Sequence, residues 1–308
     1  MLEIILKTLP FFALIGLGWG AARTGFFPVE AAAWLTRFVF FFALSAMLFR
    51  FAAELELREI WDPVFALAYL LGTLAIWGVG LGVARFRGLT WPQAAMEAHC
   101  CVIGNTGFMG VPMLIALLGE RAAGPVLLIL AIDMIVFSTL ITVIVTAGQS
   151  GRISLSTLGP LLRGLLANPM IVSMLAGLGW SALDLPIPPP ASEFLILLSA
   201  AATPGALFAI GASLAGRSAD RPLIAGWLSF AKLVLHPAAA ALACLALGVS
   251  PGPAGVMIAA AALPVASNVF MLAQYFGIAV QRVSSAVLIS TAASVATIPV
   301  IIHLIEKG

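Results

Sequence analysis

Apolar residues form long continuous stretches along most of the chain, with few polar positions between them. The hydrocarbon core of a bilayer takes about 20 residues of helix, and on that length the pattern predicts ten membrane spans. They cover residues 4–22, 31–52, 62–84, 93–118, 124–147, 162–180, 192–215, 222–247, 252–276 and 281–305. Continuous apolar runs are typical of helices, because the strands of a membrane barrel alternate apolar and polar residues. We therefore expect an all-α integral membrane protein.

Composition supports this fold class and excludes several functions. The 308 residues are 62% hydrophobic and 9% charged, with a mean hydropathy of +1.13, whereas soluble domains carry about 25% charged residues. A net charge of +2 is too small to indicate a nucleic-acid partner. Cys100, Cys101 and Cys244 all lie in apolar segments and are interpreted as packing residues. No metal site and no cofactor is expected.

The two halves of the chain resemble each other. A polar stretch at 148–161, expected to be a cytoplasmic linker, separates five spans in 1–147 from five in 162–308. The segment PFFALIGLGW near the start of the first half matches PMIVSMLAGLGW near the start of the second, and PMLIALLG matches FMLAQYFG later in each half. An odd number of spans per half makes the halves enter the membrane from opposite sides. This is the inverted-repeat plan of secondary transporters.

Spans four and nine are each interrupted by helix breakers, GNTGFMGVPM at 104–113 and LPVASN at 263–268. Paired interruptions indicate a transporter's mid-membrane site, where the N-termini of half-helices suit an anion. Asn105 and Asn268 would add side-chain amides there, and Gly107 would allow close approach of backbone or ligand. The alternative is a pair of proline kinks packed by small residues.

Three ionisable residues fall deep within spans, where they are functional candidates. Lys232 could bind a substrate carboxylate, pair with Asp133, or occupy the place of a coupling sodium ion. An isolated buried aspartate tends to take up a proton and a buried lysine to lose one, so either could couple transport to protons. Asp133 is therefore a possible coupling group, and so is His236, which follows Lys232 by one helical turn on the same face. The alternatives are a structural tie between Asp133 and Lys232, and packed or interfacial positions for His236 and Glu97.

Basic residues set the expected orientation. Arg and Lys are more frequent in the connections on the side of the 148–161 linker, and the basic side of a membrane protein faces the cytoplasm. We therefore expect a multi-pass protein of the inner (plasma) membrane with both termini outside.

The broken-span motifs GNTGFMGVPM and LPVASNVFMLAQYFG, with AKLVLHP at 231–237, resemble the auxin efflux carrier family. That family includes plant auxin carriers and bacterial malonate or malate permeases, and its fold is similar to that of the bile acid:sodium symporters. The resemblance implies a scaffold of 1–60 with 162–216 and a mobile transport core of 61–147 with 217–308. It also implies that spans four and nine cross at their breaks, with these residues at the crossover: Asn105, Pro112, Pro264 and Asn268.

These observations predict a secondary transporter that moves a small organic anion, such as an auxin-like acid, malonate or malate, by an elevator-type mechanism. A sodium-coupled symporter of the bile acid type and an anion channel remain as alternatives. The expected partners are the anion, the lipid bilayer and possible second copies joined through the scaffold helices, with no nucleic acid. An intramembrane enzyme is disfavoured, because the chain has no HExxH motif and a single deep aspartate.

Overall fold

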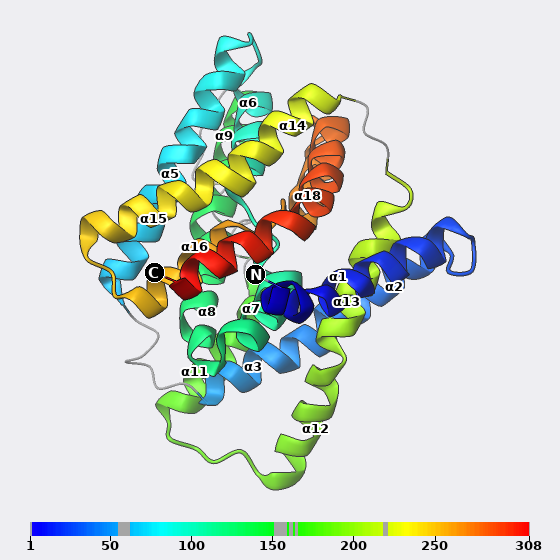
Figure 1. Cartoon of the computed structure of the whole chain (residues 1–308), viewed down its shortest axis with the longest axis vertical. Coiled ribbons are helices and arrows are strands. Elements are labelled where there is room, and N and C mark those ends of the chain that lie inside the picture. The colour runs from blue at the N-terminus through cyan, green and yellow to red at the C-terminus, as the bar shows by residue number, and fades with distance from the viewer. Residues whose placement is uncertain are drawn as a thin grey trace. The chain divides into compact units, whose positions relative to one another are not determined.

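The computed structural model describes residues 2–54, 62–150, 159, 163, 166–217 and 221–307. All its named elements are helical (Figure 1), which confirms the all-α class for these residues. Seven helical stretches are long and apolar enough to cross a membrane: Glu3–Arg23, Glu30–Glu54, Pro63–Phe86, Glu120–Gly148, Pro189–Leu214, Pro222–Leu247 and Val280–Glu306. Three shorter apolar helices cover Thr106–Leu118, Pro169–Ala182 and Pro251–Ala261. The count of ten spans stays a prediction, and most of the expected 148–161 linker lies outside the described residues.

The chain divides into two compact units, of which unit 1 comprises Met1–Asp62, Gly107–Leu128 and Leu166–Gly216. Its helices are α1 (Leu2–Arg23), α2 (Val29–Phe38), η1 (Val39–Ala43), α3 (Leu44–Glu54), α7 (Val111–Leu118), η3 (Glu120–Ala122), α11 (Pro169–Ala182), α12 (Pro189–Ala200) and α13 (Ala202–Leu214). Helix α1 packs on α13 and α3 packs on α11. The first pair packs backbone to backbone, because a Cβ at Gly211 would lie 1.9 Å from the Ile15 carbonyl oxygen. Small residues allow this close approach between membrane helices.

Unit 2 comprises Pro63–Thr106, Ile129–Leu165 and Arg217–Gly308. Its helices are α5 (Pro63–Phe86), α6 (Trp91–Val102), η4 (Asp133–Phe137), α9 (Ser138–Ser150), α14 (Pro222–Phe230), η6 (Ala231–Leu235), α15 (His236–Leu247), α16 (Pro251–Ala261), α17 (Ser267–Phe276) and α18 (Val280–Lys307). Two elements cross the division between the units: η2 (Thr106–Gly110) and α8 (Ala123–Ile132). Helix α5 packs on both α6 and α15. Two glycines make room for these neighbours, since a Cβ at Gly72 would meet the Ala239 carbonyl and one at Gly80 would meet the Cys101 sulfur.

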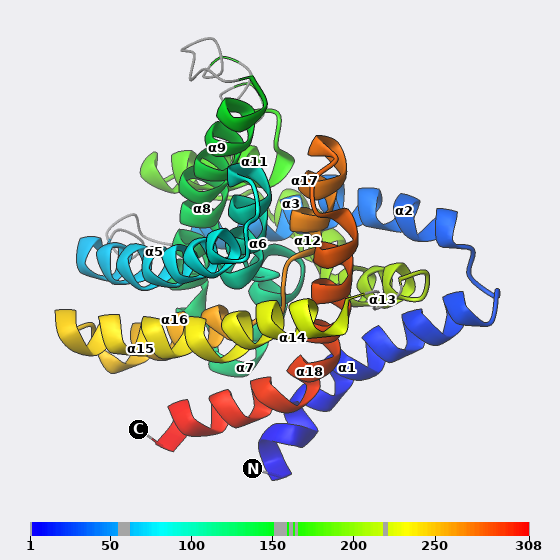
Figure 2. The same cartoon turned by 90° about the horizontal axis from the view of Figure 1, so that it is seen from above.

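Local departures from regular α-helix occur in the long helices of unit 2. Helices α14 and α15 form one rod (Figure 2) with the π-helical turn η6 between them. Pro237 explains this turn, because proline has no N–H to donate to the carbonyl of Leu233. Helix α18 bends (Figure 1) and contains Pro299, which has no N–H to donate to the carbonyl of Val295. A second π-helical turn, η4, begins at Asp133. Such turns are frequent at functional sites, and here they carry the lysine and the aspartate singled out from the sequence.

Candidate functional site

The two interrupted segments of unit 2 are hydrogen-bonded to each other. Helix α6 ends at Val102 and helical structure resumes at Thr106, while α16 ends at Ala261 and α17 begins at Ser267. Between these ends, Gly104 forms an isolated antiparallel bridge with Val265. The bridge is made by two backbone hydrogen bonds, from Asn105 N to Pro264 O at 2.9 Å and from Ala266 N to Ile103 O at 3.0 Å.

The bridge explains how non-helical backbone is accommodated between apolar helices. An unpaired backbone group in hydrocarbon costs several kcal/mol, so such a segment must find partners inside the protein. The N–H of Val265 finds one in the side-chain oxygen of Ser290 on α18, at 3.0 Å. Because the breaks satisfy each other and bind α18, the half-helix ends are held in fixed positions within unit 2.

Lys232 lies at this bridge with its side chain completely buried. Its ammonium donates to the carbonyl oxygen of Ala261, the last residue of α16, and contacts Nδ1 of His236 at 3.2 Å. A Cβ added at Gly104 would lie only 3.2 Å from the lysine nitrogen. Glycine at position 104 therefore lets the ammonium approach the paired backbone.

His236 is held on its other side by Thr73 of α5. The distance between Nε2 of His236 and the Thr73 hydroxyl oxygen is 3.0 Å. Since the Lys232 ammonium can only donate, Nδ1 must accept, and the ring proton is therefore assigned to Nε2, which donates to Thr73. This chain of contacts fixes the direction in which the lysine side chain points.

Asp133 has a partner of its own. The hydroxyl of Tyr69, one turn before Thr73 on α5, donates to one oxygen of the Asp133 carboxylate at 2.7 Å. The other carboxylate oxygen is buried with no hydrogen-bond partner in the part of the chain that the structure describes. The ion pairs among those residues do not include one between Asp133 and Lys232. A direct structural tie between the two is thus not observed.

The other candidate residues occupy different environments. Asn105 is 5% exposed beside the bridge, whereas Asn268 is exposed in the first turn of α17. Pro264 is buried in the second break, where its carbonyl accepts from Asn105. Gly107 and Pro112 belong to unit 1, in η2 and at the start of α7. The unit 2 candidates therefore place an ammonium group, an amide and half-helix N–H groups around the paired breaks.

Three residues of this network were not singled out from the sequence. Tyr69 and Thr73 are four residues apart in an otherwise apolar helix, so they share one face, and this spacing was the available signal. Ser290 is one of several hydroxyl residues in α18, and nothing in the sequence distinguishes it.

Glu97 is buried in a separate ionic cluster of unit 2. One carboxylate oxygen lies 2.7 Å from Nη1 of Arg87, and the other lies 3.1 Å from Nε of Arg282. Arg87 follows α5 and Arg282 lies in the first turn of α18, so this cluster ties two helix ends together. Its partners account for Glu97 structurally. No group of three or more metal-ligating side chains is found among the described residues.

The amino-acid sequence matches the family model described as membrane transport protein over residues 3–302. The chain belongs to this membrane transport protein family. A "Putative malonate transporter" of Rhizobium meliloti (strain 1021) is 35% identical over 314 residues, covering 100% of this chain and 98% of the relative. A "Probable auxin efflux carrier component 5a" of Oryza sativa subsp. japonica is 24% identical over 345 residues, covering 93% of this chain and 92% of the relative. These matches confirm the resemblance to auxin efflux carriers and identify a membrane transporter family rather than an enzyme family.

Proposed function

We propose that this member of the membrane transport protein family is a secondary carrier of small organic anions, which bind at the paired breaks of unit 2. The observation that carries the proposal is the buried Lys232 ammonium beside Gly104. An ammonium group has three N–H donors, and Ala261 and His236 occupy two of them. No third partner is found in the described part of the chain, and we assign this donor to a substrate carboxylate.

The chemistry around Lys232 favours an anion over a cation. Asn105 and the first N–H groups of the half-helices add further donors, and these N–H groups have no partner within their own helix. Asp133 is the nearby negative charge, and Tyr69 already donates to it. A fixed lysine at this position also supplies the positive charge that a coupling sodium ion would supply, so we expect transport without sodium.

A dicarboxylate such as malonate or malate, or an auxin-like monocarboxylate, is the proposed substrate class. Both relatives named above support a carboxylate, since one is described by malonate and the other by auxin. The relative described by malonate has the higher identity and aligns over the whole of this chain. Malonate is therefore the first substrate to test.

The proposed mechanism is elevator-type alternating access, in which a core moves against a scaffold. Ten spans in two inverted five-helix repeats would provide this architecture. Its support is that each of the seven long and three short apolar helices overlaps one predicted span. In addition, compact unit 1 combines residues 1–62 with 166–216, and compact unit 2 combines residues 63–106 with 217–308. Unit 1 also contains residues 107–128, which the simple division into scaffold and core does not anticipate. An inner-membrane location with both termini outside, and a homodimer through scaffold helices, complete the proposal.

Transport should be measured with the full chain reconstituted in liposomes. We expect saturable uptake of radiolabelled malonate, inhibited by related carboxylates and unchanged when sodium is replaced by potassium. Strict dependence on sodium would instead support the symporter of the bile acid type. Failure of every mono- and dicarboxylate to be transported would exclude the proposed substrate class.

Counter-flow and crosslinking separate a carrier from an anion channel. Liposomes preloaded with unlabelled malonate should accumulate labelled malonate transiently above its equilibrium level, because a carrier exchanges bound substrate. Cysteine pairs introduced between spans two and four should crosslink in only one state of an elevator, and substrate should change the yield. Equal crosslinking in every condition, together with no counter-flow, would indicate a channel.

A further inference from the structure

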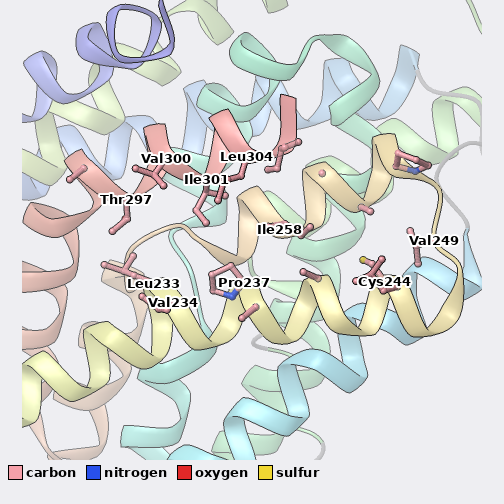
Figure 3. Close-up of a pocket in the computed structure, with 18 residues that line it drawn as sticks. Leu233, Val234, Pro237, Cys244, Val249, Ile258, Thr297, Val300, Ile301 and Leu304 are labelled. Carbon is pink, nitrogen blue, oxygen red and sulfur yellow. The ribbon is translucent and has the colours of Figure 1, made fainter. Parts of the chain in front are cut away.

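An apolar groove of about 820 Å³ lies within unit 2, between α15, α16 and α18 (Figure 3). Leu233 and Pro237 line it from the α14–α15 rod, Ile258 from α16, and Val300 and Leu304 from α18. Figure 3 shows these side chains converging from the three helices. The groove is thus formed entirely by the second half of the chain.

This groove is separate in chemistry from the anion site. Leu233 lines the groove, but the adjacent Lys232 turns its ammonium towards Ala261 and His236. None of the lining residues is charged, and Thr297 supplies the only side-chain hydroxyl. An anionic group would find no partner of opposite charge there, and burying it unpaired would be costly. The lining therefore fits a neutral hydrocarbon.

The groove continues the surface that faces lipid. Its rim includes Leu245, which is 80% exposed, and Leu304, which is 60% exposed. Both residues lie in helices long and apolar enough to cross a membrane, Pro222–Leu247 and Val280–Glu306. Large apolar side chains exposed on such helices are covered by acyl chains in a bilayer. Hydrocarbon is therefore the material that meets the open side of the groove.

We propose that this groove binds one acyl chain of a membrane phospholipid. Apolar atoms that line a void lose their van der Waals contacts on one side, and an inserted chain restores them. Helix α16 connects the bound acyl chain to Lys232. Ile258 contacts the groove, and one turn later Ala261 of the same helix accepts the hydrogen bond from Lys232. The lipid chain therefore supports the half-helix that holds the lysine.

Photolabelling tests the proposal with the full chain in nanodiscs. The probe is phosphatidylcholine with a diazirine at the end of one acyl chain, and labelled residues are mapped by mass spectrometry. We expect labelling to concentrate on lining residues of α15, α16 and α18 and to exceed that of Leu242, an exposed leucine on α15 outside the lining. Ala238→Phe should fill the groove and remove this excess, because Ala238 lines it.

Ala246→Phe is the matched control, since Ala246 is exposed on the same helix but does not line the groove. A phospholipid chain bound in the groove should also raise the melting temperature of the protein. Ala246→Phe should leave both the labelling and this rise unchanged, whereas Ala238→Phe should lose both. Uniform labelling of Leu242 and the lining, or equal behaviour of the two variants, would overturn the proposal. So would crosslinks between lining residues of two copies, which would make the groove a protein interface. Labelling requires no transport, so its outcome is independent of the carboxylate assignment.

Discussion

Lys232 and His236 are joined by a contact of 3.2 Å between the ammonium nitrogen and Nδ1 of the ring. The lysine therefore points at an imidazole that is itself fixed by Thr73, rather than at a carboxylate. We therefore propose that His236 positions the substrate-binding ammonium, while the coupling role considered from the sequence stays a prediction.

His236→Ala should weaken malonate binding, because it removes the acceptor that directs Lys232. A lost hydrogen bond to a charged group corresponds to about 1.5–3 kcal/mol, or roughly a 10- to 150-fold rise in Kd. His236→Asn can restore an acceptor near the Nδ1 position and should recover part of the affinity. If the alanine and asparagine variants bind equally well in titration calorimetry, the positioning role is wrong.

Asn105→Ala and Asn268→Ala should each lower anion affinity, since each removes an amide beside a half-helix end. The expected loss is roughly 10- to 100-fold per variant. Asn105 is buried and Asn268 is exposed, so Asn105→Ala should also lower the melting temperature, whereas Asn268→Ala should not. Unchanged affinity in both folded variants would remove the half-helix ends from the binding site.

Gly104→Ala should impair transport while the protein still inserts in the membrane. The added Cβ would lie 3.2 Å from the Lys232 nitrogen and 3.3 Å from the Ala260 carbonyl oxygen, so the ammonium must shift. Gly78→Ala on α5 is the control, because a Cβ there meets nothing within 4 Å. Malonate uptake in proteoliposomes should fall for the first variant only, and similar uptake in both would contradict this account of Gly104.

Removing Lys232 should not be compensated by removing Asp133. If the two residues formed only a structural pair, the double variant Lys232→Ala, Asp133→Ala would regain stability and transport relative to Lys232→Ala. Because Asp133 is held by Tyr69 and Lys232 by His236, we expect the double variant to remain inactive. Recovered uptake in this double-mutant cycle would show that the lysine is structural.

Glu97→Gln should destabilise the protein without a direct effect on the substrate site. Removing one partner of a buried ion pair costs about 3–5 kcal/mol, because the remaining charges are left uncompensated. Arg87 and Arg282 would both lose their carboxylate. The melting temperature should therefore fall clearly, while malonate affinity measured below that temperature stays within a factor of a few.

The broken helices and their charged neighbours could be predicted from the sequence because they violate local rules. Glycine, proline and asparagine disfavour a helix interior, so the segments 104–113 and 263–268 stand out in apolar surroundings. A lysine ten residues into a span stands out for the same reason. What the sequence could not supply was the hydrogen bonding between the breaks, which joins residues about 160 positions apart.

The hydroxyl partners were not predictable individually. A serine or threonine in an apolar helix usually bonds to a carbonyl of its own helix, and Ser290 does so with Val287 while also accepting from Val265. At another position of α18, the hydroxyl of Ser294 donates to the Thr291 carbonyl of its own helix. Which hydroxyl turns to a partner depends on how α18 packs, and that arrangement has no local sequence signal.

The role of Lys232 is tested by comparing malonate with malonamide, its neutral analogue, on wild-type protein and on Lys232→Met, which keeps the side-chain volume but removes the charge. Titration calorimetry in detergent, with folding verified by melting temperature, gives both affinities. We expect that wild type prefers malonate and that Lys232→Met loses roughly 10- to 150-fold in malonate affinity, while malonamide binding changes little. Equal malonate affinity in the two folded proteins would contradict the assignment of Lys232 as the carboxylate-binding group.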